Sequence, residues 1–202
     1  MDAAFLRSAI FGFLLLFSSL GVNYFAGNYA NAHEGNAVTD LLLDHLPVVD
    51  VDFFYIQGFA IFILFVFAVA LYEPKNIPFL TKSIALFTLI RSAFITLTHI
   101  GPFPSTAPLD AGRVSGFFNF TGDLFFSGHT GVPFLLALLF WRQTFLRRFF
   151  LFASVFFAVI VLLGHYHYSI DVFAAYFITF AIYAIAKKIF PKDFQRSETT
   201  EV

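Results

Sequence analysis

Six apolar segments, each close to the length of a bilayer-spanning helix, limit how this chain can fold. A helix needs about 20 mostly apolar residues to cross the hydrocarbon core of a membrane. The candidate segments are residues 6–26, 53–72, 81–100, 129–146, 149–166 and 170–190. Only 12% of the 202 residues are charged, roughly half the share found in soluble domains. The sequence therefore predicts an all-α integral membrane protein, a six-transmembrane-helix bundle forming one domain over residues 1–190, with a short tail at 191–202.

The basic residues predict the orientation of this bundle. With six spans, the two ends of the chain, the connection between the second and third spans and the connection between the fourth and fifth all lie on one side of the membrane. Ten of the 12 Lys and Arg residues fall in or beside these segments: Arg7, Lys75, Lys82, Arg142, Arg147, Arg148, Lys187, Lys188, Lys192 and Arg196. Because positive charge marks the cytoplasmic side, both termini and the tail are expected there. Most acidic residues and all six His residues lie on or near the opposite loops. A functional surface is therefore expected on the external face, periplasmic, lumenal or extracellular, of an inner, plasma or Golgi-type membrane.

The first apolar segment also resembles a signal peptide. It follows a single basic residue, Arg7, and precedes the small-residue string Ala30-Asn31-Ala32, which has the form of a cleavage site. We favour a retained helix because the apolar run is long for a signal sequence. After cleavage five spans would remain, and the polar face would be unchanged.

Composition excludes several kinds of function. A formal net charge of −1 gives no basic footprint for nucleic acid. The chain contains no Cys, which removes disulfides, thiolate metal sites and Cys nucleophiles together. Any catalysis must use other side chains.

Two polar strings stand against the apolar pattern on the predicted external face. Ser127-Gly128-His129-Thr130 opens the fourth span, where N–H groups at a helix start and a glycine that permits close approach can cradle phosphate oxygens. The second string contains His165, His167 and Asp171, and the spacing of four puts the last two on one helix face if the helix has begun by His167. A carboxylate beside an imidazole fixes its tautomer and raises its basicity, as a nucleophilic or general-base histidine requires.

Other interpretations fit parts of this pattern. The polar residues can form an interfacial belt, with Ser127 or Thr130 as a helix N-cap. They can line a transporter path, although Arg91 is the one comparable group near the membrane midplane. Zinc-ligand chemistry is available from His129, His165, His167 and Asp171. The final residues Thr200-Glu201-Val202 fit a PDZ-bound peptide as well as a plain solvated tail.

The two strings resemble the second and third signatures of the type 2 phosphatidic acid phosphatase superfamily, and more closely its sphingomyelin synthase branch. Thr39–Pro47 is similar to the acidic first external loop of that branch, and Arg91 with the Pro-rich exit after it is similar to the third helix. Gly122-Asp123 precedes the second signature as it does there. The resemblance covers about residues 39–188.

The resemblance implies a mechanism without metal or cofactor at a triad of His129, His167 and Asp171. His167 attacks the phosphorus of a phospholipid donor and forms a phosphohistidine, Asp171 steadies the imidazolium, and His129 moves protons to and from the lipid oxygens. Arg91 is expected to hold phosphate charge, since a cation is costly at membrane depth, unless it pairs with an internal carboxylate. The expected phosphate- or substrate-binding set is completed by Ser127, Gly128, Asp123 and His165.

One departure from the superfamily pattern narrows the expected reaction. Its phosphomonoesterases carry a K-x6-R-P signature, whereas here Ile84 stands seven residues before Arg91 and Ser92 follows it. One Arg without a partner Lys suits the single negative charge of a phosphodiester. The expected function is transfer of phosphocholine or phosphoethanolamine from a glycerophospholipid to a lipid alcohol, ceramide or diacylglycerol. A lipid phosphate phosphatase, a phospholipase C-like hydrolase and a membrane transporter are the alternatives, and the oligomeric state is left open.

Overall fold

The computed structural model describes residues 2–109 and 124–198, and no strand occurs in these two ranges. The helices are α1 (Ala3–Ala32), the π-helix η1 (Phe54–Gly58), α2 (Phe59–Tyr72), the short 3₁₀ helix η2 (Pro74–Asn76), α3 (Ile77–Leu97), α5 (Gly128–Leu139), α6 (Thr144–Leu163), α7 (Ser169–Ile189) and α8 (Pro191–Glu198). The predicted all-α class is confirmed.

Five stretches of helix in the described ranges are long and apolar enough to cross a membrane: Ala3–Ala32, Phe54–Tyr72, Pro74–Leu97, Thr144–Leu163 and Ser169–Ile189. The fourth predicted span, 129–146, instead forms the 12-residue helix α5. At 1.5 Å per residue α5 is about 18 Å long, short of a hydrocarbon core of about 30 Å. It ends at Leu139 because a turn through Trp141-Arg142 follows. The predicted count of six spans is therefore not confirmed, although a helix lies at each predicted position.

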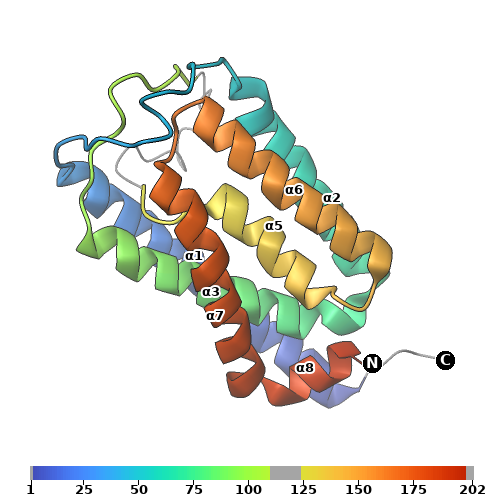
Figure 1. The fold of residues 1–202 in the computed structure, drawn as a ribbon. Helices are drawn as coiled ribbons and strands as arrows, with labels where there is room; N and C mark the ends of the chain where they lie inside the picture. The colour runs from blue at the N-terminus through green and yellow to red at the C-terminus, as the bar shows by residue number, and fades with distance from the viewer. Residues whose placement is uncertain (1, 110–123, 199–202) are drawn as a thin grey trace.

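Close helix packing explains why α5 does not need a spanning length. α1 runs along α3, while α5 packs against both α6 and α7 (Figure 1). A Cβ added at Gly131 of α5 would lie 2.7 Å from the Phe87 ring of α3 and 2.9 Å from Thr179 of α7. Gly12 plays the same part in α1, since a Cβ there would collide with Thr81 of α3. α5 is thus enclosed by other helices instead of facing lipid along its length.

The loops that carry the polar motifs lie at one end of the bundle, and α8 lies with the start of α1 at the other end (Figure 1). At the α8 end, Lys82 Nζ donates to Asp193 Oδ2 at 2.5 Å and to Ser8 Oγ at 2.6 Å, and Ser8 Oγ donates to Asp193 Oδ1 at 2.7 Å. Lys82 and Asp193 are both buried. Lys82 lies near the start of α3, which begins at Ile77, four residues before the predicted third span 81–100.

Candidate active site

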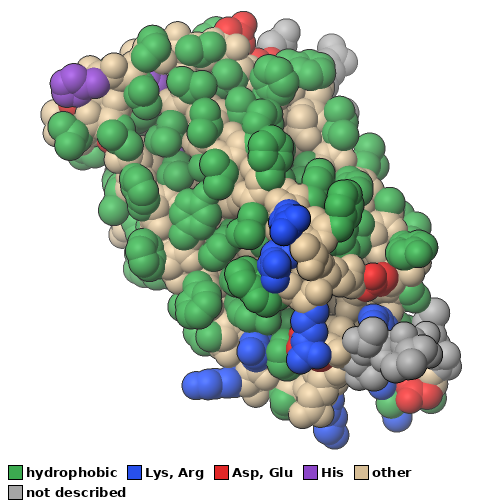
Figure 2. Space-filling view, turned by 45° about the vertical axis from the view of Figure 1, so that its right-hand side comes forward, with side chains coloured by type: hydrophobic (Ala, Val, Ile, Leu, Met, Phe, Trp, Pro, Cys, Tyr) green, Lys and Arg blue, Asp and Glu red, His purple; other side chains and the backbone are tan. Residues whose placement is uncertain are grey.

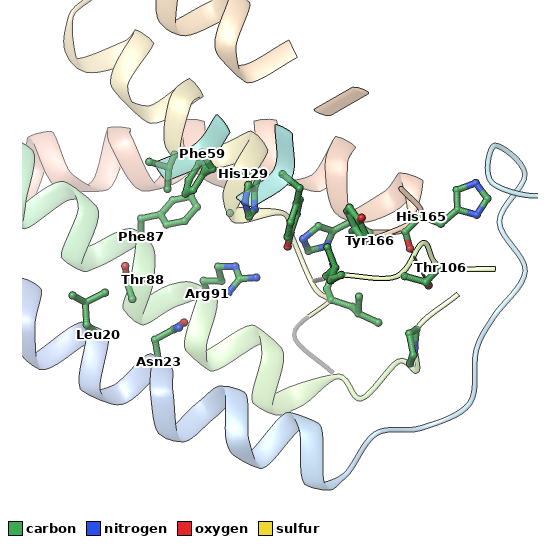
Figure 3. A pocket seen from close by; sticks show the side chains of 17 residues that line it. Leu20, Asn23, Phe59, Phe87, Thr88, Arg91, Thr106, His129, His165 and Tyr166 are labelled. Atoms are coloured by element: carbon green, nitrogen blue, oxygen red, sulfur yellow. Dashed lines mark hydrogen bonds between the residues drawn. The ribbon is translucent and has the colours of Figure 1, made fainter. Parts of the chain in front are cut away.

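A cavity of about 330 Å³ lies at the motif-bearing end of the bundle (Figure 3). Its walls come from α1, η1, α2, α3 and α5, from the loop after α3, from Leu124 ahead of α5, and from the loop between α6 and α7. Leu20 and Asn23 line it, so α1 is part of the site. The structure brings five of the predicted site residues to this cavity: Arg91, Gly128, His129, His165 and His167.

His129 is fixed by aromatic rings at the start of α5. Tyr55 stacks on its imidazole with ring centroids 4.1 Å apart and 21° between the planes, and the Phe59 ring lies at 4.1 Å. The His129 ring also hydrogen-bonds to the backbone of Tyr55. Tyr55 belongs to the π-helix η1 and Phe59 follows it directly; π-turns inside helices are frequent at functional sites. The expanded turn brings both rings to one imidazole.

His167 has its tautomer set by a backbone carbonyl. Its Nδ1 lies 3.0 Å from the carbonyl oxygen of Leu124, and because a carbonyl only accepts, Nδ1 carries the proton. Nε2 is then the nitrogen with the lone pair in the neutral ring. The side chain is buried in the protein but lines the cavity. This is the protonation pattern that a nucleophilic imidazole needs.

Asp171 lies beside His167 without a direct hydrogen bond to it. The distance from Asp171 Oδ2 to His167 Nδ1 is 3.6 Å, longer than a hydrogen bond but close enough to stabilise an imidazolium. Asp171 Oδ2 instead accepts from the Tyr168 N–H at 2.9 Å. Its Oδ1 is buried without a hydrogen-bond partner among the described residues. The sequence pattern predicted the neighbouring charge; the tautomer-setting role of Leu124 was missed, because a backbone carbonyl leaves no trace in residue type.

Ser127 joins the two motifs and does not line the cavity. Its side chain accepts from the Thr130 N–H at 3.4 Å and caps α5, and its N–H donates to the Asp171 carbonyl at 3.1 Å. The hydroxyl was expected to face a phosphate. In the structure it holds α5 against the start of α7, so the N-cap interpretation describes its geometry.

Arg91 reaches from α3 toward the start of α5 (Figure 3). Its Nε donates to the carbonyl of Phe126 at 3.1 Å, and Phe126 adopts a positive φ of 29°, which costs energy for a residue with a Cβ. A Cβ added at Gly128 would stand 3.6 Å from Arg91 Nε. The guanidinium thus lies beside helix-start N–H groups that have no intrahelical partner. Guanidinium groups and helix-start N–H groups are both donors that can bind an anion.

His165 is held in a strained backbone conformation at the outer part of the cavity. Its φ is 54°, in the left-handed region that side chains rarely adopt. The ring Nδ1 lies 3.0 Å from Ser105 Oγ, and Thr106 Oγ1 donates to the His165 carbonyl at 3.2 Å. Its Nε2 is buried without a hydrogen-bond partner among the described residues. The loop from 102 to 109 therefore orients this ring.

Asp40 and Tyr168 fasten the loops over the motif-bearing end. Asp40 Oδ2 accepts from the Ser169 N–H at 2.7 Å, and its Oδ1 accepts from the N–H groups of Leu42 and Leu43. Burial raises the pKa of the Asp40 carboxyl, but these backbone donors together outweigh it and hold the pKa below its ordinary value. The hydroxyl of Tyr168 donates to the Gly101 carbonyl at 2.9 Å and accepts from the Val38 N–H at 3.1 Å.

The remaining predicted residues lie elsewhere or outside the described ranges. Asp123 and the tail residues Thr200-Glu201-Val202 fall outside residues 2–109 and 124–198, which the structure describes. His33, His45 and His99 do not line the cavity. Within the described residues, no three His, Asp or Glu side chains form a group that could hold a metal ion.

Comparison with known protein families finds a match in the C-terminal part of the chain. Residues 121–188, about a third of the chain, match the family described as PAP2 superfamily C-terminal. The matched segment contains α5, α6 and α7 and both polar motifs. No curated protein and no solved structure matches the chain. The family match and the long apolar helices indicate an integral membrane enzyme of the lipid phosphatase or phosphotransferase kind.

Proposed function

We propose that this protein transfers a phosphocholine or phosphoethanolamine head group from a glycerophospholipid to a lipid alcohol, in the manner of a sphingomyelin synthase. The observation that carries the proposal is the pair of imidazoles, His129 and His167, that line one cavity together with Arg91. Ceramide or diacylglycerol is the acceptor. The proposed site lies on the external side of the membrane, with both termini cytoplasmic.

In the proposed mechanism, His167 Nε2 attacks the phosphorus of the donor. The bond from phosphorus to the diacylglycerol oxygen breaks, and His129 gives its proton to that oxygen. The head group remains on His167 as a phosphohistidine, and Asp171 at 3.6 Å balances the charge on the ring. His129 then takes the proton of the acceptor hydroxyl as its oxygen attacks phosphorus, which releases His167 Nε2.

The charge in the cavity favours a phosphodiester donor. Arg91 is the one Lys or Arg among the described residues that line the cavity. A phosphodiester has one negative charge, whereas a phosphate monoester carries close to two at neutral pH. The helix-start N–H groups beside Gly128 supply neutral donors to the remaining oxygens. Within the described lining, the one cation therefore matches the smaller charge.

Aromatic rings and nearby carboxylates support a cationic head group. Tyr55 and Tyr166 line the cavity with ring centroids 4.5 Å apart, and aromatic faces attract quaternary ammonium groups. Burial, and then the negative charges of Asp52 and Asp50, raise the pKa of the Tyr166 hydroxyl to about 12. The field near Tyr166 is thus negative, while the field near Arg91 is positive. A zwitterionic choline or ethanolamine phosphate fits this arrangement.

The test is product analysis with purified protein. Phosphatidylcholine and phosphatidylethanolamine are mixed with labelled ceramide or diacylglycerol, and products are identified by mass spectrometry, with His167→Ala as control. Transfer of a head group to the labelled alcohol supports the proposal. Inorganic phosphate released from phosphatidic acid, without any transfer, would establish a lipid phosphatase instead. Single Cys substitutions at Asn36 and Gln195 test the topology, since they should label from opposite sides of the membrane.

A further inference from the structure

A groove between α7 and α8 lies at the end of the bundle opposite the His cavity. It consists of two adjoining hollows of about 580 and 340 Å³. Both are lined by Phe180, Tyr183, Lys187 and Phe194, so they form one surface. None of these residues lines the His cavity. The groove is therefore separate from the candidate active site.

The groove is preformed because α8 is held near both of its ends. Asp193 in its first turn is bound by the buried Lys82 of α3 and by Ser8 of α1. Glu198 at its C-terminal end pairs with Arg142 Nε at 2.5 Å. The Phe194 ring packs against Phe79 of α3 with centroids 5.3 Å apart. Contacts from α1, from α3 and from the turn between α5 and α6 thus fix α8 against α7.

The rim of the groove carries positive charge. Lys187 Nζ lies over the rings of Phe194 and Tyr183, at 4.5 and 5.2 Å from their centroids. In the described part of the chain neither Lys187 nor Lys188 forms an ion pair with a carboxylate. The carboxylates of α8, Asp193 and Glu198, are paired with other cations, Lys82 and Arg142. Lys and Arg side chains gather over the lower part of the molecule in Figure 2, where α8 lies.

The wall of the groove changes from cationic to apolar along α7. Phe180, Ala184, Lys187 and Lys188 are spaced so that they share one face of the helix. Phe180 is 58% exposed, and so a large ring faces the membrane about two turns from the ammonium groups. Ammonium groups at the membrane boundary followed by aromatic surface toward its interior are complementary to a lipid with a negative head group.

We propose that this groove binds an anionic phospholipid of the leaflet at the α8 end, with Lys187 and Lys188 on its phosphate and an acyl chain along Phe180 and Tyr183. The inference does not depend on the proposed head-group transfer. It concerns a lipid that is bound and not turned over, at the end of the molecule away from both histidines.

The binding can be measured by native mass spectrometry of the full chain released from detergent with either phosphatidylglycerol or phosphatidylcholine. The His167→Ala background removes turnover and leaves occupancy of the His cavity equal in all variants. The Lys187→Gln/Lys188→Gln double variant should lower the affinity for phosphatidylglycerol by roughly tenfold to thirtyfold, with phosphatidylcholine retention unchanged. Phe180→Ser should weaken phosphatidylglycerol retention independently, since it removes the acyl-chain contact and no charge.

A matched control is Lys192→Gln/Arg148→Gln, which removes two exposed charges at the same end without touching the groove lining. An equal loss of phosphatidylglycerol in this variant would show general charge attraction and overturn the site. Competition by inorganic phosphate or glycerophosphoglycerol as effective as by the lipid would show an ion site without an acyl-chain groove, and would also overturn it. Unchanged binding in both the double Lys variant and Phe180→Ser has the same consequence.

Discussion

The two ends of this bundle both bury charged or ionisable side chains, but in the described residues the buried ionisable side chains that have an atom without a hydrogen-bond partner lie at the His end. At the α8 end, Lys82, Asp193 and Ser8 bond to one another at 2.5 to 2.7 Å. At the His end, His167 and Asp171 lie 3.6 Å apart. Buried atoms without a hydrogen-bond partner among the described residues gather there, including Asp52 Oδ1, Tyr166 Oη, His165 Nε2 and Asp171 Oδ1.

This difference separates a structural cluster from a site prepared for a ligand. A buried polar atom without a hydrogen-bond partner lowers the free energy of unfolding by roughly 1–3 kcal/mol. Natural proteins therefore retain such atoms where they serve another purpose. The positive φ values of Phe126 and His165 add strain at the same end. The α8 end shows neither feature in its Lys82 cluster. Substitutions at the two ends should therefore affect different properties, activity at one and stability at the other.

The largest expected effect is loss of activity in His167→Ala. Removal of the nucleophile should abolish the acid-labile phosphoenzyme formed from labelled donor lipid, since no other group supplies Nε2 at that position. His129→Ala should still form phosphoenzyme but slow each proton transfer, by about 100- to 10,000-fold. Both variants should keep the parent melting temperature within a few degrees. Turnover that survives in His167→Ala, or that disappears with chelator and returns with zinc, would favour a metal site and contradict the phosphohistidine.

The next largest effect is on stability at the opposite end. Lys82→Met leaves Asp193 charged and buried, which should cost about 3–5 kcal/mol and lower the melting temperature in detergent. Replacing both partners, as in Lys82→Met/Asp193→Leu, should restore most of the loss, because the unpaired charge is gone. Turnover below the melting temperature should match the parent in both variants. A loss of activity without a loss of stability would break the separation between the two ends.

Gly128→Ala sharpens the comparison within the His end. In the part of the chain that the structure describes, the nearest atom to the added Cβ would be Arg91 Nε at 3.6 Å, an ordinary contact, and Ala is the better helix former. The variant should therefore fold as well as the parent. If a phosphate rests on the N–H groups of this helix start, the methyl group occupies its approach, and turnover should fall about tenfold to a hundredfold. Full activity in a folded Gly128→Ala protein would place the phosphate elsewhere.

The sequence was sufficient for those features that depend on residue type and spacing. Apolar run length located α1, α2, α3, α5, α6 and α7 but not α8, which forms within the predicted tail. The spacing of His167 and Asp171 indicated an imidazole beside a carboxylate. Run length could not show that α5 stops after 12 residues, because the apolar pattern continues through the turn at Trp141. It also could not separate lipid-facing helices from one enclosed by its neighbours.

Other parts of the site arise only from tertiary contacts. The carbonyl of Leu124 sets the His167 tautomer through a contact spanning 43 positions in sequence. Tyr55 could not be distinguished from the many other aromatic residues, which are 21% of the chain, until η1 brought it onto His129. The pairing of Lys82 with Asp193 depends on how α8 folds back against α3, and the charge of Lys82 alone indicated only the cytoplasmic side.

The smallest expected effect concerns the loop contact made by Asp40, which belongs to the His end but acts on stability. Its carboxylate accepts three backbone N–H bonds from Leu42, Leu43 and Ser169, and its pKa is lowered from the ordinary value of 3.8. Because the folded state binds the proton less readily than the unfolded state, the stabilisation is present above about pH 4 and is lost as the pH falls further. Asp40→Asn should cost about 1–2 kcal/mol near neutral pH. The difference in melting temperature between parent and variant should stay constant from pH 5 to 8 and shrink below pH 4. A melting-temperature difference that instead grew as the pH fell would show that the Asp40 carboxyl binds a proton more readily in the folded state. It would contradict the proposal that the charged carboxylate holds the start of α7.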